Sequence, residues 1–95
     1  MRTRRVDANH GQIAHAFSRL GFSVLDLSRV GCGCPDLLVA KQGHSVLVEI
    51  KDGMKSASRR KLTPAEQEFR LEWRGRLVTV TCLDDVMMID KTLLL

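Results

Sequence analysis

Two β-rich runs constrain the fold of this chain most strongly. They cover residues 36–41 and 45–51 and flank a short polar turn, residues 42–44, that contains a glycine. Such runs around a Gly-containing turn predict a β-hairpin. Side chains alternate across a strand, so the β-branched residues of the second run should share one face, with Glu49 and Lys51 on the other.

Asp36 opens the first run of this hairpin. In a suitable antiparallel register its carboxylate would lie close to that of Glu49. Two carboxylates and a lysine at one edge of a sheet suit metal-assisted phosphodiester cleavage. Mg²⁺ prefers oxygen ligands, usually one or two carboxylates plus water and substrate phosphate. The metal activates a water and offsets charge in the transition state, and Lys51 would orient or help deprotonate that water.

The spacing of these residues is similar to a known pattern. Pro35-Asp36, followed about a dozen residues later by Glu49-x-Lys51, resembles the PD-(D/E)XK nuclease signature. Gly33-Cys34-Pro35-Asp36-Leu37-Leu38 and Leu62-Thr63-Pro64-Ala65-Glu66-Gln67 resemble the small VRR-NUC branch, which is common in phages and prophages and related in fold to archaeal Holliday-junction resolvases. The resemblance covers roughly residues 8–82. It implies a DNA endonuclease that uses Mg²⁺ or Mn²⁺ and leaves 5′-phosphate and 3′-hydroxyl ends.

The resemblance also implies roles for individual residues. Asp36 and Glu49 would hold the metal, with the backbone carbonyl of Ile50 as a third ligand. Lys51 would act on the water, and Gln67 would help to position the water or a phosphate.

The first helix departs from the family pattern. The family often has a glutamate near the site on this helix, where this chain has Gln12. A glutamine can accept a hydrogen bond or hold a metal-bound water, but it supplies no negative charge. We therefore expect weaker metal binding through the first helix. His10 and His15 are expected at the surface rather than as ligands.

The remaining patterns predict a single α/β domain over residues 1–95, with a small mixed central sheet flanked by helices in the order α-β-β-β-α-β-α. Helices are expected at residues 8–20 with Asn9 as N-cap, from Thr63 to Gly75, and at 83–89, and further strands at 22–28 and 77–81. Thr63, Pro64 and Glu66 form a capping-box pattern. Phe69 and Trp73 lie four residues apart and should face the core.

The charge balance favours a polyanionic partner. The chain has a formal net charge of +4, which is compatible with DNA but does not establish it. Four basic residues follow the second hairpin strand directly, in the loop 52–62, and Arg29 precedes the first one. We expect phosphate contacts from this set: Arg29, Lys55, Arg59, Arg60 and Lys61. For the basic arm at residues 1–7, a frayed terminus and a phosphate-contacting tail both remain open.

Several classes of protein are not expected. The chain has three cysteines, Cys32, Cys34 and Cys82, an odd number whose spacing fits neither a disulfide framework nor a four-ligand zinc site. There is no signal-peptide pattern and no apolar run long enough for a membrane span. We expect a cytoplasmic protein of a bacterial or phage-infected cell.

Small size leaves little room for a module that reads bases, which favours recognition of flaps, junctions or nicks and a homodimer with two sites for two strands. A helicase or another DNA-processing protein is expected as a partner. One alternative function is a nucleic-acid-binding module of the same fold without catalysis. The other is a different enzyme or a structural protein, in which Asp36, Glu49 and Lys51 form only a surface ion-pair cluster.

Overall fold

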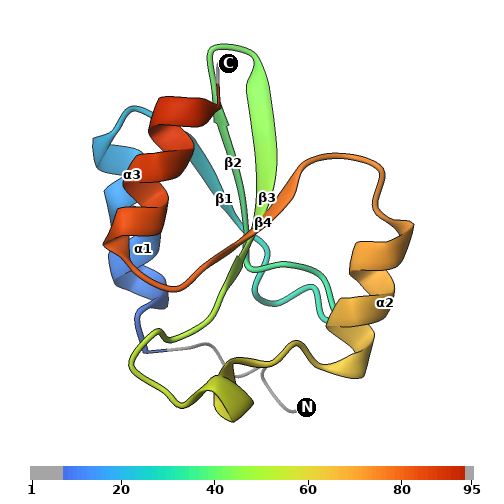
Figure 1. Cartoon of the computed structure of the whole chain (residues 1–95). Coiled ribbons are helices and arrows are strands. Elements are labelled where there is room, and N and C mark those ends of the chain that lie inside the picture. Colours follow the sequence, from blue (N-terminus) through green and yellow to red (C-terminus); the bar gives the residue numbers. More distant parts are fainter. Residues whose placement is uncertain (1–7, 94–95) are drawn as a thin grey trace.

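The computed structural model describes residues 8–93, so the basic arm at residues 1–7 lies outside the described part of the chain. The predicted α/β class and element order are confirmed (Figure 1). No helix within residues 8–93 combines the length and apolar character needed to cross a membrane. In chain order the elements are α1 (His10–Arg19), β1 (Ser23–Asp26), β2 (Leu37–Lys41), β3 (His44–Ile50), the 3₁₀ turn η1 (Ala57–Arg60), α2 (Pro64–Glu72), β4 (Leu77–Val80) and α3 (Leu83–Thr92).

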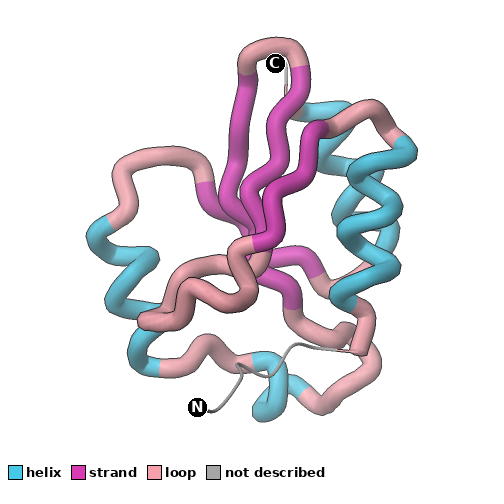
Figure 2. Tube along the Cα trace, turned by 180° about the vertical axis from the view of Figure 1, so that it is seen from behind, coloured by secondary structure: helices cyan, strands magenta, loops and turns pink. Residues whose placement is uncertain are grey.

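The four strands form one mixed sheet in the order β1-β2-β3-β4. Neighbouring strands are antiparallel from β1 to β3, whereas β3 and β4 are parallel. Parallel neighbours need a crossover connection, and here η1 and α2 provide it. Helices α1 and α3 lie side by side on one side of the sheet, and α2 lies on the other, as the views from the front and from behind both show (Figures 1 and 2).

The hydrophobic core lies between the sheet and the α1–α3 pair. Val46, Val48 and Ile50 of β3 are buried in it, as the alternation predicts. From α1, Ile13 and Phe17 meet them from positions four residues apart, which places both on one face of the helix. Residues of β2, β4 and α3, together with one residue just before β1 and one just after α3, complete this core: Phe22, Leu37, Val39, Val80, Val86 and Leu93.

The opposite face of the sheet is packed differently. Phe69 of α2 and Trp73, which directly follows α2, were expected in the core, and this is wrong for both: Trp73 is 44% exposed, and Phe69 is only partly buried. The Trp73 ring stacks on that of Phe69, with centroids 5.7 Å apart, and neither residue belongs to the main core. Helix α2 stands away from the main core on the other side of the sheet, so its aromatic pair packs on itself.

Several boundaries differ from the predicted ones. Helix α2 ends at Glu72 rather than near Gly75, and α3 continues to Thr92. The expected loop 52–62 contains η1. Asn9 precedes α1, but its side chain makes no cap. It donates instead to the backbone carbonyls of Lys51, at 3.4 Å, and Thr81, at 3.2 Å, because these two strand ends come within its reach.

Close backbone packing holds the N-terminus of α2 in place. The loop between β1 and β2 reaches α2 at Gly33, where a Cβ atom would overlap the backbone carbonyl of Ala65. Gly33 also has a φ of +77°, in the left-handed region that favours glycine. Gly31, two residues earlier, has a φ of +80° but open space around it. Gly33 is therefore required both for its backbone conformation and for the approach of α2.

This difference gives a matched pair of substitutions. Gly31→Ala should cost about 1–2 kcal/mol of unfolding free energy, the usual penalty for a left-handed L-residue. Gly33→Ala should cost clearly more, because the new methyl group also pushes α2 away. Urea unfolding of both variants tests this expectation, and equal losses would show that the contact with Ala65 relaxes without cost.

Candidate active site

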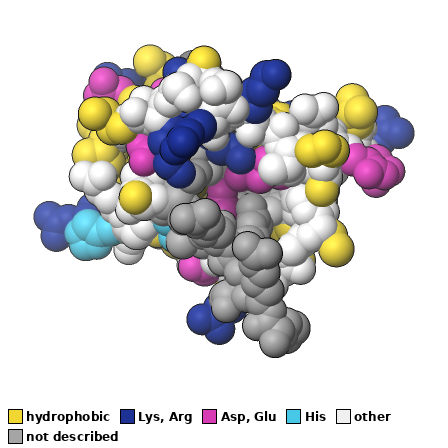
Figure 3. Space-filling view, turned by 90° about the horizontal axis from the view of Figure 1, so that it is seen from below, with side chains coloured by type: hydrophobic (Ala, Val, Ile, Leu, Met, Phe, Trp, Pro, Cys, Tyr) yellow, Lys and Arg dark blue, Asp and Glu magenta, His cyan; other side chains and the backbone are white. Residues whose placement is uncertain are grey.

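Chain segments that are distant in sequence meet at one end of the sheet, where β3 and β4 finish and β2 begins. Asp36 immediately precedes β2, Lys51 immediately follows β3, and the N-terminus of α2 approaches from the other side. Seen from this end, acidic side chains lie near the middle of the face with basic side chains beside them (Figure 3).

The hairpin register brings the two predicted metal ligands together. Leu37 pairs with Val48, so continuing the antiparallel ladder by one pair sets Asp36 opposite Glu49. The Asp36 N–H donates to the Val48 carbonyl at 2.9 Å. The Asp36 Oδ2 accepts from the Ile50 N–H at 2.7 Å. Backbone and side chain of Asp36 are thus both tied to β3.

Glu49 is the most unusual carboxyl group of the site. It is 3% exposed and its side chain forms a hydrogen bond with that of Asp36. Burial raises the pKa of Glu49 to about 9. The hydrogen bond with Asp36 and the charge of Asp36 raise this pKa further, and so does the charge of Glu66. The positive charge of Lys51 lowers it. Glu49 is therefore held as the neutral acid at pH 7 when no cation is present.

Lys51 is directed towards α2. Its Nζ donates to Oε1 of Glu66 at 2.9 Å, and both side chains are largely buried. The same Oε1 accepts from the Thr63 N–H at 2.8 Å, while the Thr63 hydroxyl accepts from the Glu66 N–H. The predicted capping box is confirmed. Burial alone would raise the pKa of Glu66, but the hydrogen bonds from Lys51 and from the Thr63 backbone outweigh it, so the pKa lies below its usual range.

Helix α2 thus contributes Glu66 to the site, whereas the sequence pointed to its neighbour. Gln67 is exposed, and its amide donates to the Leu62 carbonyl at 3.1 Å. The capping-box pattern singled out Glu66 in the sequence. Because helix capping already explained why a glutamate stands there, the pattern gave no reason to expect a second role for Glu66 in the site. The second contact, with Lys51, joins positions 15 residues apart and depends on where α2 packs.

The predicted phosphate-binding residues all lie at the surface. Lys55, Arg59, Arg60 and Lys61 are all exposed in the segment that follows β3, and Arg29 is exposed in the loop before β2. Their exposure leaves them available to solvent, and their contacts with phosphate stay a prediction.

Gln12 lies on the other side of the sheet. It is exposed on α1 and lines a groove between the N-terminal parts of α1 and α3, together with Asn9 and Asp52. His10, expected at the surface, is buried, and its Nε2 lies 3.3 Å from Oδ2 of Asp26. The first helix therefore meets the end of the sheet through Asn9 and His10.

The residues present fit a hard divalent cation of the kind that retains water. No group of three or more His, Cys, Asp or Glu side chains arranged as a metal site occurs within residues 8–93. Asp36 and Glu49 are two adjoining carboxyl groups, and two carboxylates with water and substrate phosphate are what Mg²⁺ usually needs. A cation that replaced the proton on Glu49 would also offset the repulsion between the two carboxylates.

Comparisons with known proteins add no assignment: no family model, curated protein or solved structure matches this chain.

The raised pKa of Glu49 predicts how stability depends on pH in chelator. The folded chain keeps a proton that the unfolded chain releases above a pKa of about 4.3, so the stabilisation is complete at low pH and is lost as pH rises towards about 9. Between pH 5.5 and 8.5, the wild type should lose up to about 1.4 kcal/mol per pH unit more than Glu49→Gln. Urea unfolding measures both slopes, with Glu68→Gln as control. Parallel slopes would contradict the shift.

Proposed function

We propose that this chain is a divalent-metal-dependent DNA endonuclease of the PD-(D/E)XK type, similar to the VRR-NUC branch. One observation carries the proposal: the β2–β3 register sets the buried Asp36 and Glu49 carboxyl groups against each other, with Lys51 following at the same strand end. Two carboxyl groups and a lysine in this arrangement match the chemical needs of phosphodiester hydrolysis.

Asp36 and Glu49 would hold Mg²⁺ or Mn²⁺, with the Ile50 carbonyl as the third protein ligand. When bound, the cation would polarise the scissile phosphate and lower the pKa of the attacking water. Glu49 must give up its proton for this role. The Asp36 carboxylate is already held in place by the Ile50 N–H. Binding of a cation would therefore cost little conformational entropy at this side chain.

Lys51 would orient the attacking water and stabilise the negative charge that develops on the phosphate. Its ammonium group needs a fixed position for either task, because a flexible lysine side chain has many rotamers. The contact with Glu66 Oε1 supports such a position, and the capping box in turn fixes Glu66. Glu66 is then a positioning residue that acts through Lys51.

The exposed basic residues around the site support a nucleic acid as substrate. Lys55, Arg59, Arg60 and Lys61 follow β3 directly, where they would contact phosphates on either side of the scissile bond. The small domain favours branched, flapped or nicked DNA over a base sequence. A homodimer, with one site for each strand, remains a prediction that light scattering tests.

Cleavage of a labelled four-way junction, a flap and a plain duplex tests the function directly. Cleavage should require Mg²⁺ or Mn²⁺ and stop in chelator. Glu49→Ala should lower the rate at least about a hundredfold, with gel-resolved products as the readout. Binding of DNA without cleavage in either metal would favour the inactive binding module. Neither binding nor cleavage would favour a structural ion-pair cluster.

The role of Glu66 has its own matched test. Glu66→Gln keeps the capping box, since glutamine serves equally at this helix position, but removes the charge that holds Lys51. We expect kcat to fall about tenfold to a hundredfold with little change in KM and with an altered pH profile. Glu68→Gln removes one charge from the exposed side of the same helix and should leave both constants nearly unchanged. Equal effects of the two substitutions would contradict the positioning role.

A further inference from the structure

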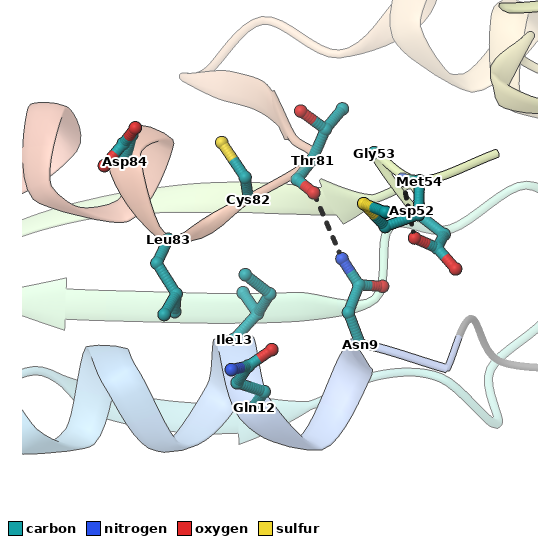
Figure 4. Close-up of a pocket in the computed structure, with 10 residues that line it drawn as sticks. All are labelled: Asn9, Gln12, Ile13, Asp52, Gly53, Met54, Thr81, Cys82, Leu83 and Asp84. Atoms are coloured by element: carbon teal, nitrogen blue, oxygen red, sulfur yellow. Dashed lines mark hydrogen bonds between the residues drawn. The ribbon is translucent and has the colours of Figure 1, made fainter. Parts of the chain in front are cut away.

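A second concave site lies beside the proposed catalytic centre, on the opposite face of the sheet. It is a groove of about 490 Å³ between the N-terminal parts of α1 and α3, here called the α1–α3 groove. Its apolar surface comes from Ile13, Met54 and Leu83 and its polar surface includes Asn9, Gln12 and Asp52 (Figure 4). The volume falls within the range of about 300–1,000 Å³ typical of small-ligand sites.

Asn9 fixes one wall of the groove through hydrogen bonds to two strand ends. Its Nδ2 donates to the carbonyls of Lys51 and Thr81, of which the second bond is drawn in Figure 4. Carbonyl oxygens only accept, so the amide orientation is determined and Oδ1 faces away from them. This Oδ1 is buried and has no donor within residues 8–93. A ligand in the groove therefore does not reach this oxygen, and the side-chain acceptors that line the groove for it are the Gln12 amide and the carboxylates of Asp52 and Asp84.

The charges of the groove select against phosphate. Of the ten residues in the described chain that line it, two are aspartates, Asp52 and Asp84, and none is Lys or Arg. A phosphate group would meet negative charge there without compensation. A flat, uncharged ring with N–H donors at its edge fits better, because it can bury a face against the aliphatic side chains while amide and carboxylate oxygens accept from its edge.

The groove is also continuous with the proposed catalytic strand. The Lys51 carbonyl accepts from Asn9, and Asp52 follows Lys51 directly. Side chains of neighbouring residues in an extended segment point to opposite sides, so Lys51 faces the cluster at α2 while Asp52 faces the groove. A strand with a phosphate at Lys51 would thus have a neighbouring nucleotide close to the groove.

We propose that the α1–α3 groove binds an unpaired nucleobase of the DNA strand that is cleaved. This inference rests on the proposed nuclease function and deepens it. A base within a duplex cannot enter, since its edge is paired and its faces are stacked, whereas a base at a flap or junction is free to leave the stack at low cost. The groove would make cleavage prefer branched DNA without reading a sequence.

The experiment uses a flap DNA in two forms, with a cytosine or an abasic residue as the unpaired nucleotide next to the branch. Affinity is measured by fluorescence anisotropy in chelator, and cleavage is measured separately with Mg²⁺. Leu83→Asp alters the groove, and Met87→Asp is its matched control, because both leucine and methionine are about half exposed on α3 but only Leu83 lines the groove. Circular dichroism verifies that both variants fold.

For the wild type and Met87→Asp, the cytosine flap should bind about tenfold more tightly than the abasic flap, because one face of its ring is buried against aliphatic side chains. For Leu83→Asp this difference should largely disappear. Equal binding of the two flaps by the wild type would overturn the proposal even if Leu83→Asp failed to fold, and so would equal behaviour of the two variants. Base-dependent binding without any cleavage would support the groove and reject the nuclease. Metal-dependent cleavage at the same rate with and without the base would support the nuclease and reject base binding in the groove.

Discussion

The register between β2 and β3 is the constraint on which the rest of the site depends. Side chains alternate with a period of two, so a slip by one residue would turn Glu49 and Lys51 towards α1 and α3. Val46, Val48 and Ile50 prevent this slip, because it would expose three buried apolar side chains. Hydrophobic packing on one face of the sheet therefore positions the carboxyl groups on the other face.

The carboxyl cluster is costly to bury and is arranged so that each group has a partner. Asp36 accepts from a backbone N–H, Glu49 hydrogen-bonds to Asp36, and Lys51 pairs with Glu66. Keeping Glu49 neutral avoids two adjacent buried negative charges. The result is a site whose side chains are already oriented and whose charge state would change if a cation displaced the proton of Glu49, as the proposed function requires.

The two faces of the sheet are packed in different ways. The α1–α3 side holds the continuous hydrophobic core, whereas α2 is joined to the rest by a few specific contacts. These include the close approach of Gly33 to Ala65, the Lys51–Glu66 pair, and a hydrogen bond of 2.7 Å from Arg70 to Thr79. Because α2 contributes little to the core, its position is set by polar contacts, and its aromatic pair remains partly exposed.

The sequence by itself determined the order of the elements, the face of β3 that enters the core and the start of α2 at Thr63, because periodicity and capping depend on residues close together in the chain. Only the tertiary structure decided that Glu66 rather than Gln67 contacts Lys51. Neighbouring positions on a helix point about 100° apart, so this choice depends on how α2 packs. It also decided that Asn9 joins β3 to β4 and that Trp73 is exposed, since contacts between distant residues follow from the placement of whole helices and strands.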